Sequence, residues 1–148
     1  MSGRVVVASG YFNPIHVGHL DYIESAKKLG DYLIVIVNND SQVDLKGSVP
    51  FMNENDRLRI VSSIKGVDRA VVSEDCGRSV VTTLKRIYDT YINDPFFVSM
   101  TFCNGGDRTE GNSPEEDFCK QFGINTAYGV GGSKSRSSSD LINSANIS

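Results

Sequence analysis

The chain has 148 residues, of which 39% are hydrophobic and 22% are charged, and its formal net charge at pH 7 is −3. This length predicts a single domain over residues 1–148, and the charge gives no reason to expect nucleic acid or an anionic membrane as a partner. No apolar run approaches the roughly 20 residues of a membrane-spanning helix. Because there is no signal-peptide pattern and the three cysteines lack metal-like spacing, we expect a cytoplasmic protein with reduced thiols.

Five short runs predict strands, and the first two of them are typical of strands buried on both faces. They cover residues 4–9, 32–38, 69–73, 96–102 and 124–130. Apolar residues at helical spacing predict helices over 17–29, 53–64, 79–92 and 113–123, and a last short helix within 137–146. The polar residues 39–52 are predicted to form a loop. This alternation predicts an α/β fold, a five-stranded parallel sheet with helices on both faces.

The segment GYFNPIHVGH, residues 10–19, follows the first predicted strand, opens the first predicted helix and holds both histidines of the chain. The backbone N–H groups at a helix start favour an anion, and Gly10 and Gly18 leave room for a phosphate to approach the backbone. His16 and His19 are three residues apart and therefore face the same side. Two imidazoles there are suited to donate hydrogen bonds to a phosphate chain. A metal site is less favoured, because no Cys or third His completes the set of ligands. The alternative is that one histidine caps the helix and the other packs.

The four residues HVGH resemble the HxGH signature of the nucleotidyltransferase superfamily. The resemblance implies a Rossmann-like fold, and it implies that His16 and His19 contact the phosphates of a nucleoside triphosphate and stabilise the transition state. It also places Tyr11 and Phe12, with the two glycines of the segment, at the nucleotide. Several branches share this signature, including cytidylyltransferases, adenylyltransferases and class I aminoacyl-tRNA synthetases. The short chain and the missing KMSKS-like motif exclude the last of these.

The segment LGDYLIVIVNNDSQVDLKG resembles the sugar- and polyol-phosphate branch, typified by glycerol-3-phosphate cytidylyltransferase and heptose-1-phosphate adenylyltransferase. That branch has an Asp after the second strand and a Lys six residues on, here Asp40 and Lys46. The resemblance implies that Lys46 neutralises phosphate and that Asp40 and Arg57 lie at the acceptor. The run FCNGGDR resembles a nucleotide-binding loop and places Asp107 there. The alternatives to these functional roles are that Lys46 and Arg57 are solvated surface side chains and that Asp107 forms an Asx turn.

The run GVGGSKSRSSSDLI resembles the C-terminal motif of the superfamily, an Arg-Thr pair followed by Ser-Thr at a helix start. Ser137 and Ser138 match the Ser-Thr and are expected at the β- and γ-phosphates. A Gly-Ser pair at 132–133 stands where Arg-Thr is expected, so Lys134 or Arg136 is the candidate for the missing positive charge.

Asn13 is a second departure, because the sugar- and polyol-phosphate branch usually has Asp at this position. The run FNPIHVGH is closer to the nicotinamide mononucleotide branch. An Asn keeps the shape of an Asp without its charge, and we expect Asn13 on the acceptor side of the site.

The resemblance as a whole implies transfer of a nucleoside monophosphate from CTP or ATP to a phosphorylated polyol or sugar, with release of pyrophosphate. The acceptor phosphate is already an anion, so no general base is needed, and catalysis rests on positioning and charge stabilisation. We expect Mg²⁺ as cofactor, held by substrate oxygens and water with no protein ligand assigned. A nicotinamide mononucleotide-type adenylyltransferase and a silent nucleotide-binding module are the alternatives. Relatives of this kind imply a possible homodimer.

Overall fold

The computed structural model describes residues 3–47, 49, 52–77, 79–105 and 113–130. The strands are β1 (Arg4–Gly10), β2 (Tyr32–Val37), β3 (Arg69–Val72), β4 (Ser99–Gly105) and β5 (Asn125–Val130). The helices are α1 (Val17–Lys27), α2 (Asp40–Leu45), α3 (Glu54–Ser62), α4 (Val81–Tyr91) and α5 (Pro114–Phe122). The last predicted helix, within 137–146, lies outside the described residues.

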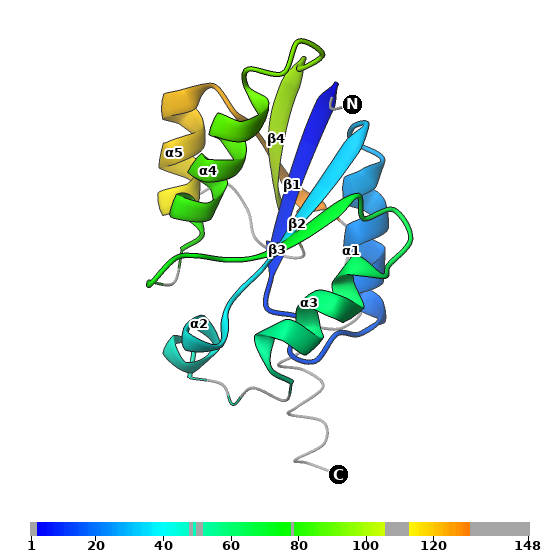
Figure 1. Cartoon of the computed structure of the whole chain (residues 1–148), viewed down its shortest axis with the longest axis vertical. Coiled ribbons are helices and arrows are strands. Elements are labelled where there is room, and N and C mark those ends of the chain that lie inside the picture. Colours follow the sequence, from blue (N-terminus) through cyan, green and yellow to red (C-terminus); the bar gives the residue numbers. More distant parts are fainter. Residues whose placement is uncertain (1–2, 48, 50–51, 78, 106–112, 131–148) are drawn as a thin grey trace.

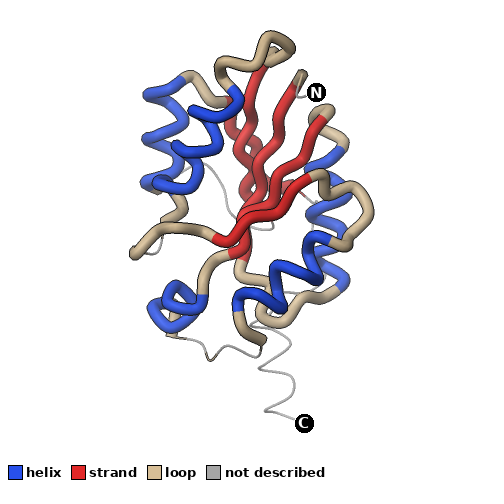
Figure 2. The backbone as a smooth tube through the Cα atoms, in the orientation of Figure 1, coloured by secondary structure: helices blue, strands red, loops and turns tan. Residues whose placement is uncertain are grey.

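The five strands form one parallel sheet in the order β3-β2-β1-β4-β5. Figure 1 shows α4 and α5 on one face of this sheet and α1 and α3 on the other, and Figure 2 shows the twisted strands as the middle layer. The predicted α/β Rossmann-like fold is confirmed. The chain order reverses direction across the sheet at β1, and ligands of such sheets bind beyond the carboxyl ends of the strands at that point.

Two apolar cores lie on the two faces of the sheet, because successive side chains of a strand point to opposite faces. On one face, Val5, Val7 and Ile34 pack with residues of α4 and α5. On the other, Val6 and Ala8 pack with residues of α1 and α3. Burial on both faces explains why the first two strands are continuous apolar runs rather than alternating ones.

The helix α2 lies where a loop was predicted, so the prediction is wrong over Asp40–Leu45. Asn39 caps this helix: its side-chain oxygen accepts from the backbone N–H of Gln42 at 2.9 Å, and the Gln42 side chain accepts from the Asn39 N–H at 3.0 Å. This reciprocal pair is a capping box. Six residues are too few to show a helical period of apolar side chains, which is why the helix was missed.

Other boundaries differ by a few residues. The strand predicted from residue 96 begins at Ser99, because the Asp94 side chain accepts from the Phe96 backbone N–H at 2.8 Å and holds a turn there. The predicted helix 17–29 ends at Lys27, and the predicted helix 79–92 spans Val81–Tyr91. The predicted helix starts at Asn53 and Ser113 are confirmed as caps of α3 and α5.

Candidate active site

The candidate site lies where β1 and β2 end side by side. Gly10 and Val37, the last residues of the two strands, are paired in register. The Asn38 N–H also donates to the Gly10 carbonyl at 3.0 Å. Residues 10–19, here called the histidine segment, begin at the end of β1, and the α2 region follows β2. Both therefore start from one point at the carboxyl edge of the sheet.

The two histidines form a capping box at the start of α1. His16 is the N-cap, and its Nδ1 accepts from the Gly18 N–H at 3.0 Å, while the Nδ1 of His19 accepts from the His16 N–H at 3.1 Å. The two rings stack with centroids 3.9 Å apart. The alternative that a histidine caps the helix is therefore correct as a structural statement. The same geometry, however, gives both rings a defined chemical form.

A backbone N–H can only donate, so each Nδ1 must be an acceptor and the proton of each neutral ring lies on Nε2. Burial, with smaller contributions from His16 and Lys46, lowers the pKa of His19 to about 3. At physiological pH His19 is therefore a neutral donor through Nε2–H. The capping box thus fixes two imidazoles as N–H donors at the N-terminus of a helix, which is where an anion binds.

The ring of Phe12 packs against the ring of His19. The Phe12 ring is 1% exposed and meets the His19 ring edge-on, with centroids 4.9 Å apart. A Cβ placed on Gly10 would lie 2.8 Å from the Phe12 ring. Phe12 also has a left-handed backbone, with φ of 52°. The side chain of Phe12 is thus part of the core, and the first task of Gly10 in this structure is to make room for that ring.

Lys46 brings a positive charge to this place. It follows the last turn of α2 as its C-cap, and its Nζ lies 4.3 Å from the centroid of the Tyr11 ring, a cation–π contact. Its charge is also one of the causes that lower the pKa of His19. Lys46 and the two histidines, 27 or more residues apart in the chain, are therefore brought together by the ends of β1 and β2.

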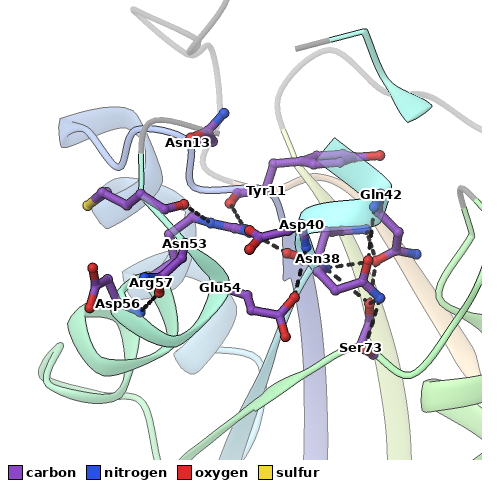
Figure 3. A network of polar contacts seen from close by, with 12 residues as sticks. Tyr11, Asn13, Asn38, Asp40, Gln42, Asn53, Glu54, Asp56, Arg57 and Ser73 are labelled. Carbon is purple, nitrogen blue, oxygen red and sulfur yellow. Dashed lines mark hydrogen bonds and ion pairs between the residues drawn. The ribbon is translucent and has the colours of Figure 1, made fainter. Parts of the chain in front are cut away.

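Arg57 lies in a network of polar contacts with Tyr11, Asn38 and Asp40 (Figure 3). It is 1% exposed. Its Nη1 donates to the carbonyls of Tyr11 and Asn38 at 2.9 and 2.6 Å, and its Nε to the carbonyl of Met52 at 3.1 Å. Its Nη2 pairs with Asp40 Oδ1 at 2.6 Å. The geometry does not support the expectation that Arg57 reaches an acceptor phosphate, because its donors already hold three loops together.

Asp40 and Asn13 also make contacts within the protein. The Asp40 N–H donates to Glu54 Oε1 at 2.9 Å, and the Asp40 side chain stays 38% exposed beside Arg57. Asn13 is 4% exposed, and its Nδ2 donates to the carbonyl of Val49 at 2.9 Å. Asn13 thereby ties the histidine segment to the chain that follows α2.

Three predicted site residues, Asp107, Ser137 and Ser138, lie outside the described residues. The structure adds polar residues that the sequence reasoning missed, above all Gln42 and Ser73 (Figure 3). Asn39 is a further partner of Gln42. The spacing of Asn39 and Gln42 is that of a capping box, and this was the available signal for them.

The described residues offer no group of three or more His, Cys, Asp or Glu side chains that could hold a metal ion. The two histidines are also unsuited as ligands through Nδ1, because that atom accepts a backbone N–H in both. Within the part of the chain that the structure describes, no helix is long and apolar enough to span a membrane.

The chain is similar in sequence to several known proteins. A FAD synthase of Thermoplasma acidophilum is 44% identical over 84 residues, which are 55% of this chain and 59% of the relative. A FAD synthase of Picrophilus torridus is 31% identical over 121 residues, 82% of this chain and 78% of the relative. The bifunctional protein HldE of Koribacter versatilis is 40% identical over 74 residues, 49% of this chain and 15% of the relative. The matched segment spans about half the length of four of the curated relatives, all named FAD synthase.

Among solved structures, the crystal structure of the lipopolysaccharide core biosynthesis protein from Thermoplasma volcanium has a TM-score of 0.66. It is 28% identical and covers 89% of this chain and 98% of that chain. The family model for cytidylyltransferase-like proteins matches residues 7–105, from β1 through the end of β4. The matched region holds the histidine segment, α2 and Arg57, and the chain belongs to the cytidylyltransferase-like family of nucleotidyltransferases.

Proposed function

We propose that the protein transfers a nucleoside monophosphate from a nucleoside triphosphate to a phosphate group of a small acceptor and releases pyrophosphate. The observation that carries this proposal is the pair of stacked histidines, each held by a backbone N–H at Nδ1 and so carrying its proton on Nε2. Family membership supports it. Two neutral donors and the Lys46 cation at a helix N-terminus suit a phosphate chain whose charge shifts during reaction.

In this mechanism an oxygen of the acceptor phosphate attacks the α-phosphorus in line. A new P–O bond forms to the acceptor, the bond to the β-phosphate bridging oxygen breaks, and pyrophosphate leaves with that electron pair. The nucleophile is already an anion, so the protein has no proton to remove. His16 and His19 stabilise the α- and β-phosphate oxygens, and Lys46 neutralises the charge that gathers on the leaving group. Mg²⁺ is the cofactor we propose, bound to phosphate oxygens and water.

For the substrates, we place ATP and flavin mononucleotide first. FAD consists of AMP joined to flavin mononucleotide through a pyrophosphate linkage, and relatives named FAD synthase include one that aligns over 82% of this chain. The exposed apolar side chains Leu45 and Val49 also support an acceptor with an aromatic body. The Val49 carbonyl accepts from Asn13 in the histidine segment, so the exposed side chain of Val49 is a candidate for contact with a flat ring system.

A sugar or polyol phosphate is the second candidate. The order of Asp40 and Lys46 after β2 resembles that branch, and the fold neighbour from Thermoplasma volcanium is described as a lipopolysaccharide core biosynthesis protein. A nicotinamide mononucleotide acceptor remains the third possibility, on the strength of Asn13.

The test is release of pyrophosphate in the presence of Mg²⁺. ATP and CTP would each be combined with flavin mononucleotide, glycerol 3-phosphate, sugar 1-phosphates and nicotinamide mononucleotide, and products would be identified by mass. We expect ATP with flavin mononucleotide to give FAD, and His19→Ala to abolish most of the signal. Turnover with a sugar phosphate alone would reassign the acceptor. Triphosphate binding with no pyrophosphate from any pair would contradict the proposal and leave a nucleotide-binding module.

A further inference from the structure

The geometry points to Gln42 as a positioning residue that fixes Lys46 at the phosphate site by clamping α2 to the β3–α4 connection (residues 73–77, 79 and 80). The inference rests on the proposed function insofar as Lys46 is assigned to phosphate. Its structural part, that Gln42 determines where Lys46 lies, is independent of which substrates the protein uses.

The helix α2 cannot hold its own position. A six-residue helix is far below the length at which an isolated helix is stable in water. Ser41, Asp44 and Leu45 are exposed, and Val43 is the one apolar side chain of α2 that is buried. The place of this helix, and of the lysine at its end, must therefore be set by specific contacts to the rest of the protein.

Gln42 supplies those contacts from a fully buried side chain. Its Oε1 accepts from Asn38 Nδ2 at 3.1 Å and from the Asn39 N–H at 3.0 Å, and it also accepts from the Ser73 hydroxyl. One amide oxygen thus joins the end of β2, the cap of α2 and the end of β3. Figure 3 shows Gln42, Asn38 and Ser73 converging there.

The amide nitrogen of the same side chain makes the second half of the clamp. Nε2 of Gln42 donates to the carbonyls of Gly77 and Ser79 at 2.8 and 2.9 Å. Carbonyls can only accept and the Asn39 N–H can only donate, so the orientation of the amide is determined. Both polar atoms of Gln42 are used, and an apolar replacement would leave buried partners unsatisfied.

The β3–α4 connection is a firm base for the clamp. Asp75 is 7% exposed, and its carboxylate accepts from the N–H groups of Thr82 and Thr83 at 2.8 and 3.1 Å, at the start of α4. Asn39 Nδ2 reaches the same connection through the carbonyls of Ser73 and Asp75 at 3.1 and 3.0 Å. The clamp therefore attaches α2 to an element that is packed in the core.

The link from Gln42 to Lys46 is direct. The backbone N–H of Lys46 donates to the carbonyl of Gln42 at 3.1 Å. A displacement of Gln42 would move the Lys46 backbone with it, and the contact of Nζ with the Tyr11 ring at 4.3 Å would be lost. Displacement of a catalytic cation by about 1 Å is enough to lower a rate by on the order of 10²-fold.

The first arm of the test needs no substrate. Lysines would be dimethylated with ¹³C, and the Lys46 resonance would be assigned by its loss in Lys46→Ala. We expect this resonance to be displaced by the Tyr11 ring current in the wild-type protein. In Gln42→Met it should move to the position of a solvated lysine, and in Ser73→Ala it should move part of the way. Phe118→Leu, which loosens the core at α5, is the control that should leave it unchanged.

The second arm is a double-mutant cycle on kcat/KM. We expect Gln42→Met to lower kcat/KM on the order of 10²-fold in the wild type and to have little further effect when Lys46 is already alanine. Equal losses in both backgrounds, or an unmoved Lys46 resonance in folded Gln42→Met and Ser73→Ala, would overturn the inference. If the wild-type protein releases no pyrophosphate with any substrate pair, the proposed function fails, while the resonance still decides whether Gln42 positions Lys46.

Discussion

The histidine segment and α2 bring charged or polar groups to the same site by opposite means. In the histidine segment, the bonds that orient the two rings join residues two and three apart in the chain. In α2, the bonds that hold Gln42, and through it Lys46, include three to residues 31 to 37 positions away. One half of the site is therefore specified locally and the other half by the tertiary fold, so substitutions should affect the two halves differently.

The largest effect should come from removing a donor in the locally built half. We expect His19→Ala to lower kcat about 10²–10³-fold, as for loss of one transition-state donor. His16→Asn sharpens the comparison, because Asn is a good N-cap but cannot place a donor where Nε2 lies. It should keep the melting temperature of the wild-type protein and still lose activity. Near-normal kcat in either variant would contradict the assigned role.

Arg57→Met should have the next largest effect, on stability. The substitution leaves the Asp40 carboxylate and three loop carbonyls without their donor. We expect the free energy of unfolding, measured in urea, to fall by about 3 kcal/mol. Arg57→Lys should recover little of the lost free energy of unfolding, because one ammonium group cannot reproduce the several hydrogen bonds of the planar guanidinium. A loss below about 1 kcal/mol, combined with a raised KM for the acceptor, would instead favour a direct contact with substrate.

Gly10→Ala should cost less, because it adds one methyl group. Its Cβ would lie 2.8 Å from the Phe12 ring, and overpacking of this kind destabilises by about 1–3 kcal/mol. The double variant Gly10→Ala/Phe12→Leu should be more stable than the sum of the two single changes predicts. Additive losses would show that the glycine is needed for another reason, such as approach of a phosphate.

The effect of pH comes last because it is absent at neutral pH. The folded-state pKa of His19, about 3, is below its unfolded value, so the unfolded chain binds the extra proton between these two values. Stability should therefore be undiminished above pH 6.5 and should fall as the pH drops from 6.5 toward 3, with a slope of at most about 1.4 kcal/mol per unit from this residue. Urea titrations of wild type and His19→Gln should differ in that slope. Equal slopes would show that His19 titrates normally.

The same contrast explains what could be predicted from the sequence. The strands β1 and β2 were predicted because they are buried on both faces and so read as apolar runs, and the histidine segment because its two histidines stand three residues apart at a helix start. The sequence reasoning missed α2 because six residues show no helical period and because part of what holds the helix, the bonds from Gln42 to Gly77 and Ser79, joins residues remote in the chain. Arg57 was placed at the acceptor by the resemblance, and no pattern in the sequence shows that its donors meet the carbonyls of Tyr11 and Asn38.

The most direct test of the account is the chemical form of the two imidazoles. Long-range ¹H–¹⁵N spectra of the ¹⁵N-labelled protein at pH 7, with and without a non-hydrolysable triphosphate and Mg²⁺, distinguish Nδ1 from Nε2. We predict two neutral rings with the proton on Nε2, and a change at both Nε2 atoms when the triphosphate binds. The claim is that the capping box orients the histidines to donate hydrogen bonds to phosphate. It would be contradicted by protons on Nδ1, or by Nε2 resonances that do not change when the triphosphate binds.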